Sequence, residues 1–158
     1  MSLPPASSTS VLTILSEENL LQLRKSFSAS DFAVAPKVLL GGMYEPAQTW
    51  IGPFVDRFFT QNPVLTPDRR EQIIISALLA AQASSAYMSV HFYAGLMEGL
   101  DVAQIAETLL LAGQYSGVPR LTQAMTALQQ TLVLLQQSAS NGALTTQAVV
   151  KVLLDAFG

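Results

Sequence analysis

Helix start and stop signals divide residues 66–119 into short pieces, and this punctuation constrains the fold more than any other feature. A threonine and a proline open a helix over 66–83, and two serines then cap a second helix over 85–98. Gly99 has the position of a glycine that ends a helix, and Asp101-Val102-Ala103-Gln104 has the spacing of a capping box. No segment alternates polar and apolar residues with a period of two. The sequence therefore predicts an all-α fold in which the helices 66–83 and 85–98 form a central antiparallel hairpin.

The sequence of the first 59 residues predicts a tail followed by helices. Residues 1–15, rich in serine, threonine and proline, are expected to be a loosely ordered tail that packs at most through its few apolar side chains. Ser16 is expected to cap a helix that ends near Phe27, and Ser30-Asp31 to cap another that runs towards Gly41-Gly42. Aromatic and aliphatic residues then recur at helical spacing over 46–59, which is typical of core packing.

The C-terminal half continues in the same way. The helix over 66–83 is apolar on nearly every side, which indicates a central position. Pro119 opens a long helix, and Thr145 or Thr146 caps a last amphipathic one. Residues 16–158 are thus expected to form a single domain.

Composition limits the partners. Half of the residues are apolar and 12% are charged, so we expect copies of the chain to associate and cover part of the apolar surface. The longest apolar run, Ile73–Ala83, is too short and too polar for a membrane span. A net charge of −3 with eight lysines and arginines gives no basic stripe for nucleic acid. Without a signal-peptide pattern at the start, the expected location is the cytoplasm.

The order of these pieces resembles the carboxymuconolactone decarboxylase family, which includes the alkyl hydroperoxide reductase D type proteins. The resemblance is carried by Leu65-Thr66, Arg70-Glu71, His91, Ala94, Leu96, Gly99, Ile105, Glu107, Tyr115, Gly117, Pro119 and Ala124. It implies the helical fold of that family, assembled as a trimer or hexamer. It also implies that His91 is the general acid or base of the site.

The chain departs from its relatives close to His91. Peroxidase-type members carry two cysteines seven and four residues before the histidine, where this chain has Ser84 and Tyr87 and no cysteine anywhere. A hydroxyl cannot form a sulfenic acid or a disulfide, so thiol peroxidase chemistry is excluded. The lactone decarboxylases resemble one another in a glutamate at the position of Tyr87. The sequence therefore leaves two interpretations of His91 open, a catalytic one and a buried structural one.

The acidic partner of His91 is also left open by the sequence. The resemblance implies a glutamate about one helix upstream, and counting back from His91 reaches Gln72, so that Glu71 fits only with a one-residue gap. Glu71 can instead lie in the first turn of its helix and favour the helix dipole. Tyr115, at the end of a later helix, is expected to be structural or to offer its hydroxyl to a pocket.

Two functions follow from these residues. The first is a cofactor-free lyase that acts on a small carboxylated lactone. In it His91 transfers the proton with Glu71 as its partner, and Tyr87 or Tyr115 stabilises an oxyanion. Arg70 or Arg120 binds the substrate carboxylate, and Ser84 is a further candidate for substrate binding. The second is a non-catalytic helical oligomer that binds a small ligand or a protein partner. One histidine and no cysteine predict neither a metal site nor another cofactor.

Overall fold

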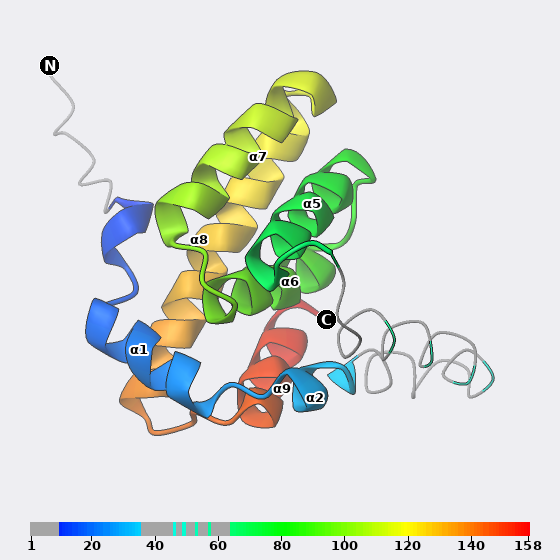
Figure 1. Cartoon of the computed structure of the whole chain (residues 1–158). Coiled ribbons are helices and arrows are strands. Elements are labelled where there is room, and N and C mark those ends of the chain that lie inside the picture. The colour runs from blue at the N-terminus through cyan, green and yellow to red at the C-terminus, as the bar shows by residue number, and fades with distance from the viewer. Residues whose placement is uncertain (1–9, 36–45, 47–48, 50–52, 54–56, 58–63) are drawn as a thin grey trace, which may run out of the picture.

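Helices account for nearly all of the regular structure. The structure, a computed structural model, describes residues 10–35, 46, 49, 53, 57 and 64–158. No strand occurs within these residues, which confirms the predicted all-α class. A 3₁₀ helix, η1, comes first, and the α-helices carry the labels of Figure 1. Their bounds are η1 (Val11–Thr13), α1 (Glu17–Ser26), α2 (Ala29–Phe32), α5 (Pro67–Ala80), α6 (Ser85–Met97), α7 (Val102–Ser116), α8 (Val118–Ser140) and α9 (Thr146–Phe157).

Capping residues explain most of these bounds. The side chain of Ser16 accepts a hydrogen bond from the backbone at the start of α1, and Thr145 does the same for α9. Both halves of the predicted capping box between Asp101 and Gln104 are present at the start of α7. Gly99 has φ of +115°, which a side chain would strain, and it ends α6 as predicted.

The start of α2 differs from the prediction. Ser28, not Ser30-Asp31, is the N-cap, and its hydroxyl accepts from the backbone N–H of Asp31 in the first turn. The continuation of this helix towards Gly41-Gly42 lies outside the described residues, as does most of the aromatic stripe over 46–59. Of the predicted tail, residues 10–15 form η1 and a bend that packs against the core through Leu15.

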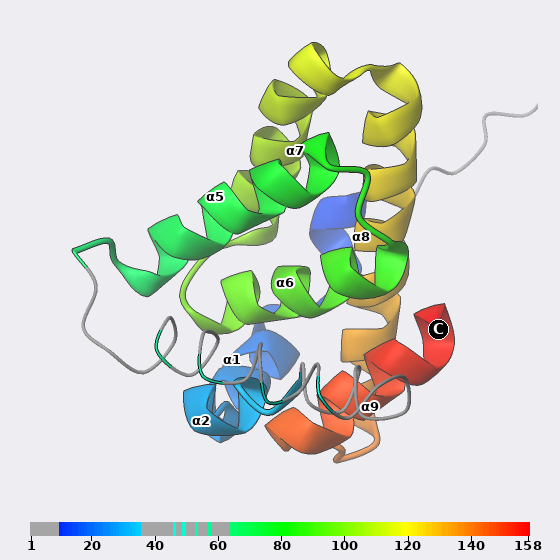
Figure 2. The same cartoon turned by 90° about the vertical axis from the view of Figure 1, so that its right-hand side faces the viewer.

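Helix α6 lies at the centre of the described fold. Figure 2 shows it crossing the middle of the molecule, with α5 above it and α1, α2 and α9 below. Ten of its thirteen residues are buried. Helix α5 runs back along it and packs against both α6 and α7, so the predicted antiparallel hairpin is confirmed.

Helix α5 is less enclosed in the single chain than its nearly all-round apolar sequence led us to expect. Only Arg70, Glu71, Ile75 and Leu79 of α5 are buried. Ile73, on the opposite side, is 56% exposed. The central helix of the hairpin is therefore α6, because α5 covers one side of it and presents its other side outwards.

Arg24 ties helix α1 to the end of α6. Its Nε donates to the carbonyl of Leu96 at 2.7 Å, and its Nη2 donates to the carbonyl of Leu100 at 2.9 Å. Carbonyls at the end of a helix lack partners within the helix, and a cation there also favours the helix dipole. Arg24 therefore holds the C-terminal end of α6 in place.

No helix among the described residues is both long enough and apolar enough to cross a membrane.

Replacing Arg24 with methionine should destabilise the fold. The substitution keeps the aliphatic stem and removes both hydrogen bonds, so we expect the free energy of unfolding to fall by about 1–3 kcal/mol. Lys25→Met is the matched control, because Lys25 is exposed in the same turn. Urea denaturation of both variants measures the difference, and an equal effect of the two substitutions would contradict the role of Arg24.

Candidate functional site

A buried carboxylate binds the only histidine of the chain. Oε2 of Glu71, on α5, lies 2.9 Å from Nδ1 of His91, on α6. The Glu71 side chain is 2% exposed and that of His91 is 17% exposed. Burying a carboxylate costs free energy unless a hydrogen-bond donor pairs with it. Separating Glu71 from His91 would therefore destabilise the hairpin.

Gly95, on α6, packs against α5 beside the pair. Gly95 follows His91 by one turn and therefore shares its face of α6. A Cβ atom added to Gly95 would lie 3.6 Å from Cβ of Glu71 and 3.5 Å from Cδ1 of Ile75, which are ordinary contact distances, and 3.0 Å from Cδ1 of Leu100. Gly95 is therefore a point of close contact between the two helices.

The contact also determines which ring nitrogen is available for chemistry. An ionised carboxylate can only accept hydrogen bonds, so Nδ1 of His91 carries the donating proton. No hydrogen bond to Nε2 is found within the described part of the chain. In the neutral ring Nε2 has a free lone pair and can take a proton, and in the charged ring it can give one.

The structure decides between the two positions that the sequence left open for the acidic partner. Glu71 belongs to the second turn of α5, and the acidic residue of the first turn is Asp68. The interpretation of Glu71 as a helix-dipole residue is therefore wrong. Gln72 points away from His91, because its Nε2 donates to Oγ1 of Thr108, on α7, at 3.4 Å.

Two further side chains surround the pair. The ring of Phe32, on α2, packs against the imidazole of His91 with centroids 6.0 Å apart and planes at 81°. Glu98, at the C-cap of α6, is half-buried and close enough to Glu71 for the two charges to interact. Burial raises the pKa of the Glu98 carboxyl, the charges of Glu71 and Asp68 raise it further, and Arg70 lowers it.

Ser84 and Tyr87 lie on α6 before His91. The hydroxyl of Ser84 caps the helix by accepting from the backbone N–H of Tyr87 at 3.4 Å, as the sequence predicted. Tyr87 is one turn before His91 and its side chain is 42% exposed. Their roles in binding a substrate or an oxyanion stay predictions.

The guanidinium of Arg120 binds the turn between α5 and α6. Its Nη1 donates to the carbonyl of Ala80 at 2.7 Å. The amide of Gln82 faces the same guanidinium, and its oxygen accepts from Nε at 2.7 Å and Nη2 at 2.8 Å. Gln82 has φ of +55°, so Arg120 holds a strained turn.

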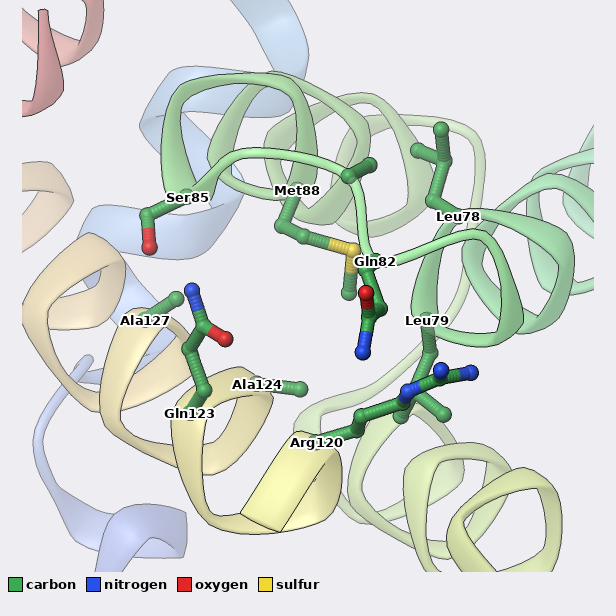
Figure 3. Close-up of a pocket in the computed structure, with 10 residues that line it drawn as sticks. Leu78, Leu79, Gln82, Ser85, Met88, Arg120, Gln123, Ala124 and Ala127 are labelled. Atoms are coloured by element: carbon green, nitrogen blue, oxygen red, sulfur yellow. The ribbon is translucent and has the colours of Figure 1, made fainter. Parts of the chain in front are cut away.

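The small pocket beside Arg120 is not the site of His91. Figure 3 shows Arg120 and Gln82 at its edge and Met88 pointing into it. Its volume of about 10 Å³ admits one water molecule at most. His91 does not line it. Arg120 therefore stabilises the turn and lies in a pocket apart from His91, and its predicted contact with a substrate carboxylate stays a prediction.

The remaining two candidates differ in their surroundings. Arg70 directly precedes Glu71, is 6% exposed and acts on the Glu98 carboxyl, so it belongs to the same region of the hairpin. Tyr115 is 92% exposed and borders an open groove between α5 and α7, whose lining does not include His91.

No three histidine, aspartate or glutamate side chains gather closely enough to hold a metal ion in the described ranges.

A comparison with protein families identifies the chain. The model of the carboxymuconolactone decarboxylase family matches residues 52–130, which is half of the chain. The chain belongs to this family. The matched region contains Glu71, His91, Gly95 and Glu98, whereas Arg24 and Phe32 lie before it. No curated protein and no solved structure matches the chain significantly.

Two residues near the pair were not among the candidate site residues predicted from the sequence. Glu98 follows His91 by seven residues and therefore shares its face of α6, a spacing that is visible in the sequence. Phe32 gave no signal, because it lies on a separate helix and outside the family match.

Glu98 should make the stability of the protein depend on pH. A carboxyl whose pKa is raised in the folded state stabilises the fold at low pH, and this contribution is lost as the pH rises through the raised value. Glu98→Gln should therefore raise Tm at pH 7.5, and the gain should shrink as the pH falls towards 4.5, the usual pKa of a glutamate. Thermal melts at several pH values measure this.

The matched control for Glu98→Gln is Glu107→Gln, because Glu107 is exposed on α7. A gain in Tm that is the same at pH 7.5 and at pH 4.5 would contradict the assignment of a raised pKa to Glu98.

Proposed function

We propose that the protein is a cofactor-free enzyme that transfers a proton through His91, most simply a lyase that removes carbon dioxide from a small carboxylated lactone. The observation that carries the proposal is the buried hydrogen bond between Glu71 and Nδ1 of His91. An oriented imidazole with one free nitrogen meets the geometric requirement for a general acid or base. Membership of the carboxymuconolactone decarboxylase family supports this class of substrate.

The reaction places separate demands on the residues. Decarboxylation breaks the bond between the carboxyl carbon and its neighbour and leaves the electron pair on that neighbour, delocalised over the lactone. The charged imidazole of His91 then protonates this carbon through Nε2 and regains a proton from water. Glu71 stabilises the imidazolium, because its buried carboxylate is within hydrogen-bond distance of Nδ1.

Three other residues complete the proposed reaction. The hydroxyl of Tyr87 is the proposed donor to the developing oxyanion, because this side chain lies one turn before His91 and is partly exposed. Arg70 is the proposed partner of the substrate carboxylate, because its charge lies next to Glu71 and Glu98. Ser84 is proposed to donate a hydrogen bond to the substrate. Its hydroxyl accepts a hydrogen bond when it caps α6, and its own proton remains available for donation.

A ligand-binding oligomer without catalysis is the second candidate. The observation that favours it is the apolar outer face of α5 and α7, where Ile73, Leu111 and Tyr115 are each more than half exposed. Together with residues between them, these side chains line the open groove of about 460 Å³, and none of the lining residues is charged.

We propose that this outer face joins copies of the chain. Tyr115 projects beside the open apolar groove, so a side chain of a neighbouring copy can fill the groove in a head-to-tail contact, which closes into a ring such as a trimer. The low charge of the chain supports self-association over a charged partner. The family resemblance implies three or six copies.

Substituting the two residues of the pair tests the catalytic proposal. His91→Gln keeps most of the size and one donor but removes titration near neutral pH, so turnover should fall by roughly 10²-fold or more. Glu71→Gln should lower turnover in the same direction by a smaller factor, because the ring loses its charged partner. Release of carbon dioxide from a panel of carboxylated lactones measures both.

The melting temperature of His91→Gln separates catalysis from structure. If His91 is only structural, the altered buried hydrogen bond costs about 1–3 kcal/mol and ligand binding persists in the folded fraction. An unchanged rate together with a lower Tm would contradict the catalytic assignment. A wild-type protein that releases no carbon dioxide from any lactone of the panel would contradict the proposed substrate class.

Light scattering tests the assembly. The wild-type protein should have three or six times the chain mass of 16.9 kDa at micromolar concentration. Leu111→Glu should shift the mass towards a single chain, because it places a charge in the apolar groove. Leu12→Glu, at an exposed leucine on η1, should leave the mass unchanged. A wild-type mass near 16.9 kDa would rule the assembly out.

A further inference from the structure

Two groups from different helices contact the imidazole of His91. Glu71, on α5, binds Nδ1, and Phe32, on α2, packs against the ring at close to a right angle. Figure 2 shows α5 and α2 on opposite sides of α6. The centroid distance of 6.0 Å and the angle of 81° are those of a favourable edge-to-face pair. Phe32 is 4% exposed, so this contact is shielded from water.

One hydrogen bond does not fix an imidazole ring. The second side-chain torsion of histidine is broad, so a ring held only at Nδ1 can still tilt or turn away from its partner. A second contact on the ring itself restricts that torsion. Phe32 supplies such a contact, and Glu71 supplies the polar one.

Phe32 is itself held in place from three directions. Arg24 anchors the preceding helix to the carbonyls of Leu96 and Leu100 at the end of α6. The backbone N–H of Ser28 donates to Oγ1 of Thr146, on α9, at 2.8 Å. Phe27 packs on Phe32, with centroids 6.1 Å apart. These contacts therefore fix the position of the short helix α2 and of Phe32 at its end.

We propose that Phe32 is a positioning residue, which holds the His91 ring so that Nδ1 stays on Glu71 and Nε2 is presented to the substrate. This inference rests on the proposed function of His91. It adds to that function a part of the chain outside the family match, because α1 and α2 precede residue 52. In this arrangement Glu71 and His91 belong to the region that matches the family, and the N-terminal helices contribute Phe32, which orients the imidazole ring.

Nitrogen NMR of the ring tests the proposal without any substrate. His91 is the only histidine, so its two ring nitrogens give an unambiguous pair of signals whose positions report which nitrogen carries the proton. At a pH where the ring is neutral, the wild-type protein should show mainly the Nδ1–H form, because Glu71 accepts from Nδ1. Free histidine is mainly in the Nε2–H form.

Phe32→Leu should lower the fraction of the Nδ1–H form towards that of free histidine. The matched control is Phe157→Leu, which removes a partly buried ring that packs against the core from the end of α9. This control should leave the two nitrogen signals of His91 unchanged even where it lowers Tm. Phe32→Tyr keeps the ring and should keep the Nδ1–H form.

Phe32→Met covers the case in which the leucine variant does not fold, because methionine removes the ring and fills a similar volume. Nitrogen signals identical to wild type in a folded Phe32→Leu or Phe32→Met variant would overturn the positioning role, whatever happens to Tm. Nitrogen signals that change equally in Phe157→Leu would overturn it as well.

Glu71→Ala separates this inference from the proposed function. If Glu71→Ala abolishes the Nδ1–H form and the Phe32 variants do not alter it, only the positioning role fails. If Glu71→Ala also leaves the signals unchanged, the acid–base pair fails, and the proposed function fails with it. With a substrate in hand, Phe32→Leu should lower kcat more than it raises KM, because it misorients the ring without touching the substrate.

Discussion

A buried hydrogen bond between a glutamate and a histidine on two facing helices is the interaction on which the rest of this structure depends. A carboxylate as deeply buried as Glu71 is tolerable only if a donor meets it, and the donor is a histidine on the facing helix. The two groups meet because α5 and α6 are joined by a short turn and pack side by side. Any shift of one helix along the other would separate the pair and leave a charge without its partner. The geometry of the hairpin and the chemistry of His91 therefore constrain each other.

The packing of α6 explains how this geometry is kept. Helix α6 is covered by α5, α8, α9 and α1, whereas α5 has one side free. Arg24 fixes the C-terminal end of α6, and Arg120 fixes the turn at its start through Ala80 and Gln82. Arg24 and Arg120 thus both stabilise the ends of α6. An acid–base residue on the most enclosed helix has little freedom to move, which favours a site that is organised before any ligand arrives.

Capping residues and helix-ending glycines in the sequence predicted where many of the helices begin and end. They predicted less well which helices contact one another. Ser16, Gly99 and the capping box at Asp101 act within one turn of backbone, so their effects could be predicted from spacing alone. The choice between Glu71 and Gln72 depends on the rotation of α5 relative to α6, which periodicity leaves uncertain by one residue. Phe32 reaches His91 across 59 positions of sequence, through helices whose docking rests on Arg24 and Ser28. Such contacts arise only once the whole core is packed.

Peroxidase-type members of the family need both a source of electrons and a group that transfers a proton, and this site keeps only the second. Those members pair a histidine relay with two cysteines, and this chain keeps a glutamate–histidine pair with Ser84 and Tyr87 in place of the thiols. Thiols supply electrons, whereas the imidazole supplies only a proton. A site reduced to the imidazole and its carboxylate can therefore serve reactions in which a proton moves and no external electron donor is needed. Decarboxylation is such a reaction, because the departing carbon dioxide leaves its bonding electrons behind. Without cysteine, the chemistry that we propose for this site is proton transfer by the glutamate–histidine pair.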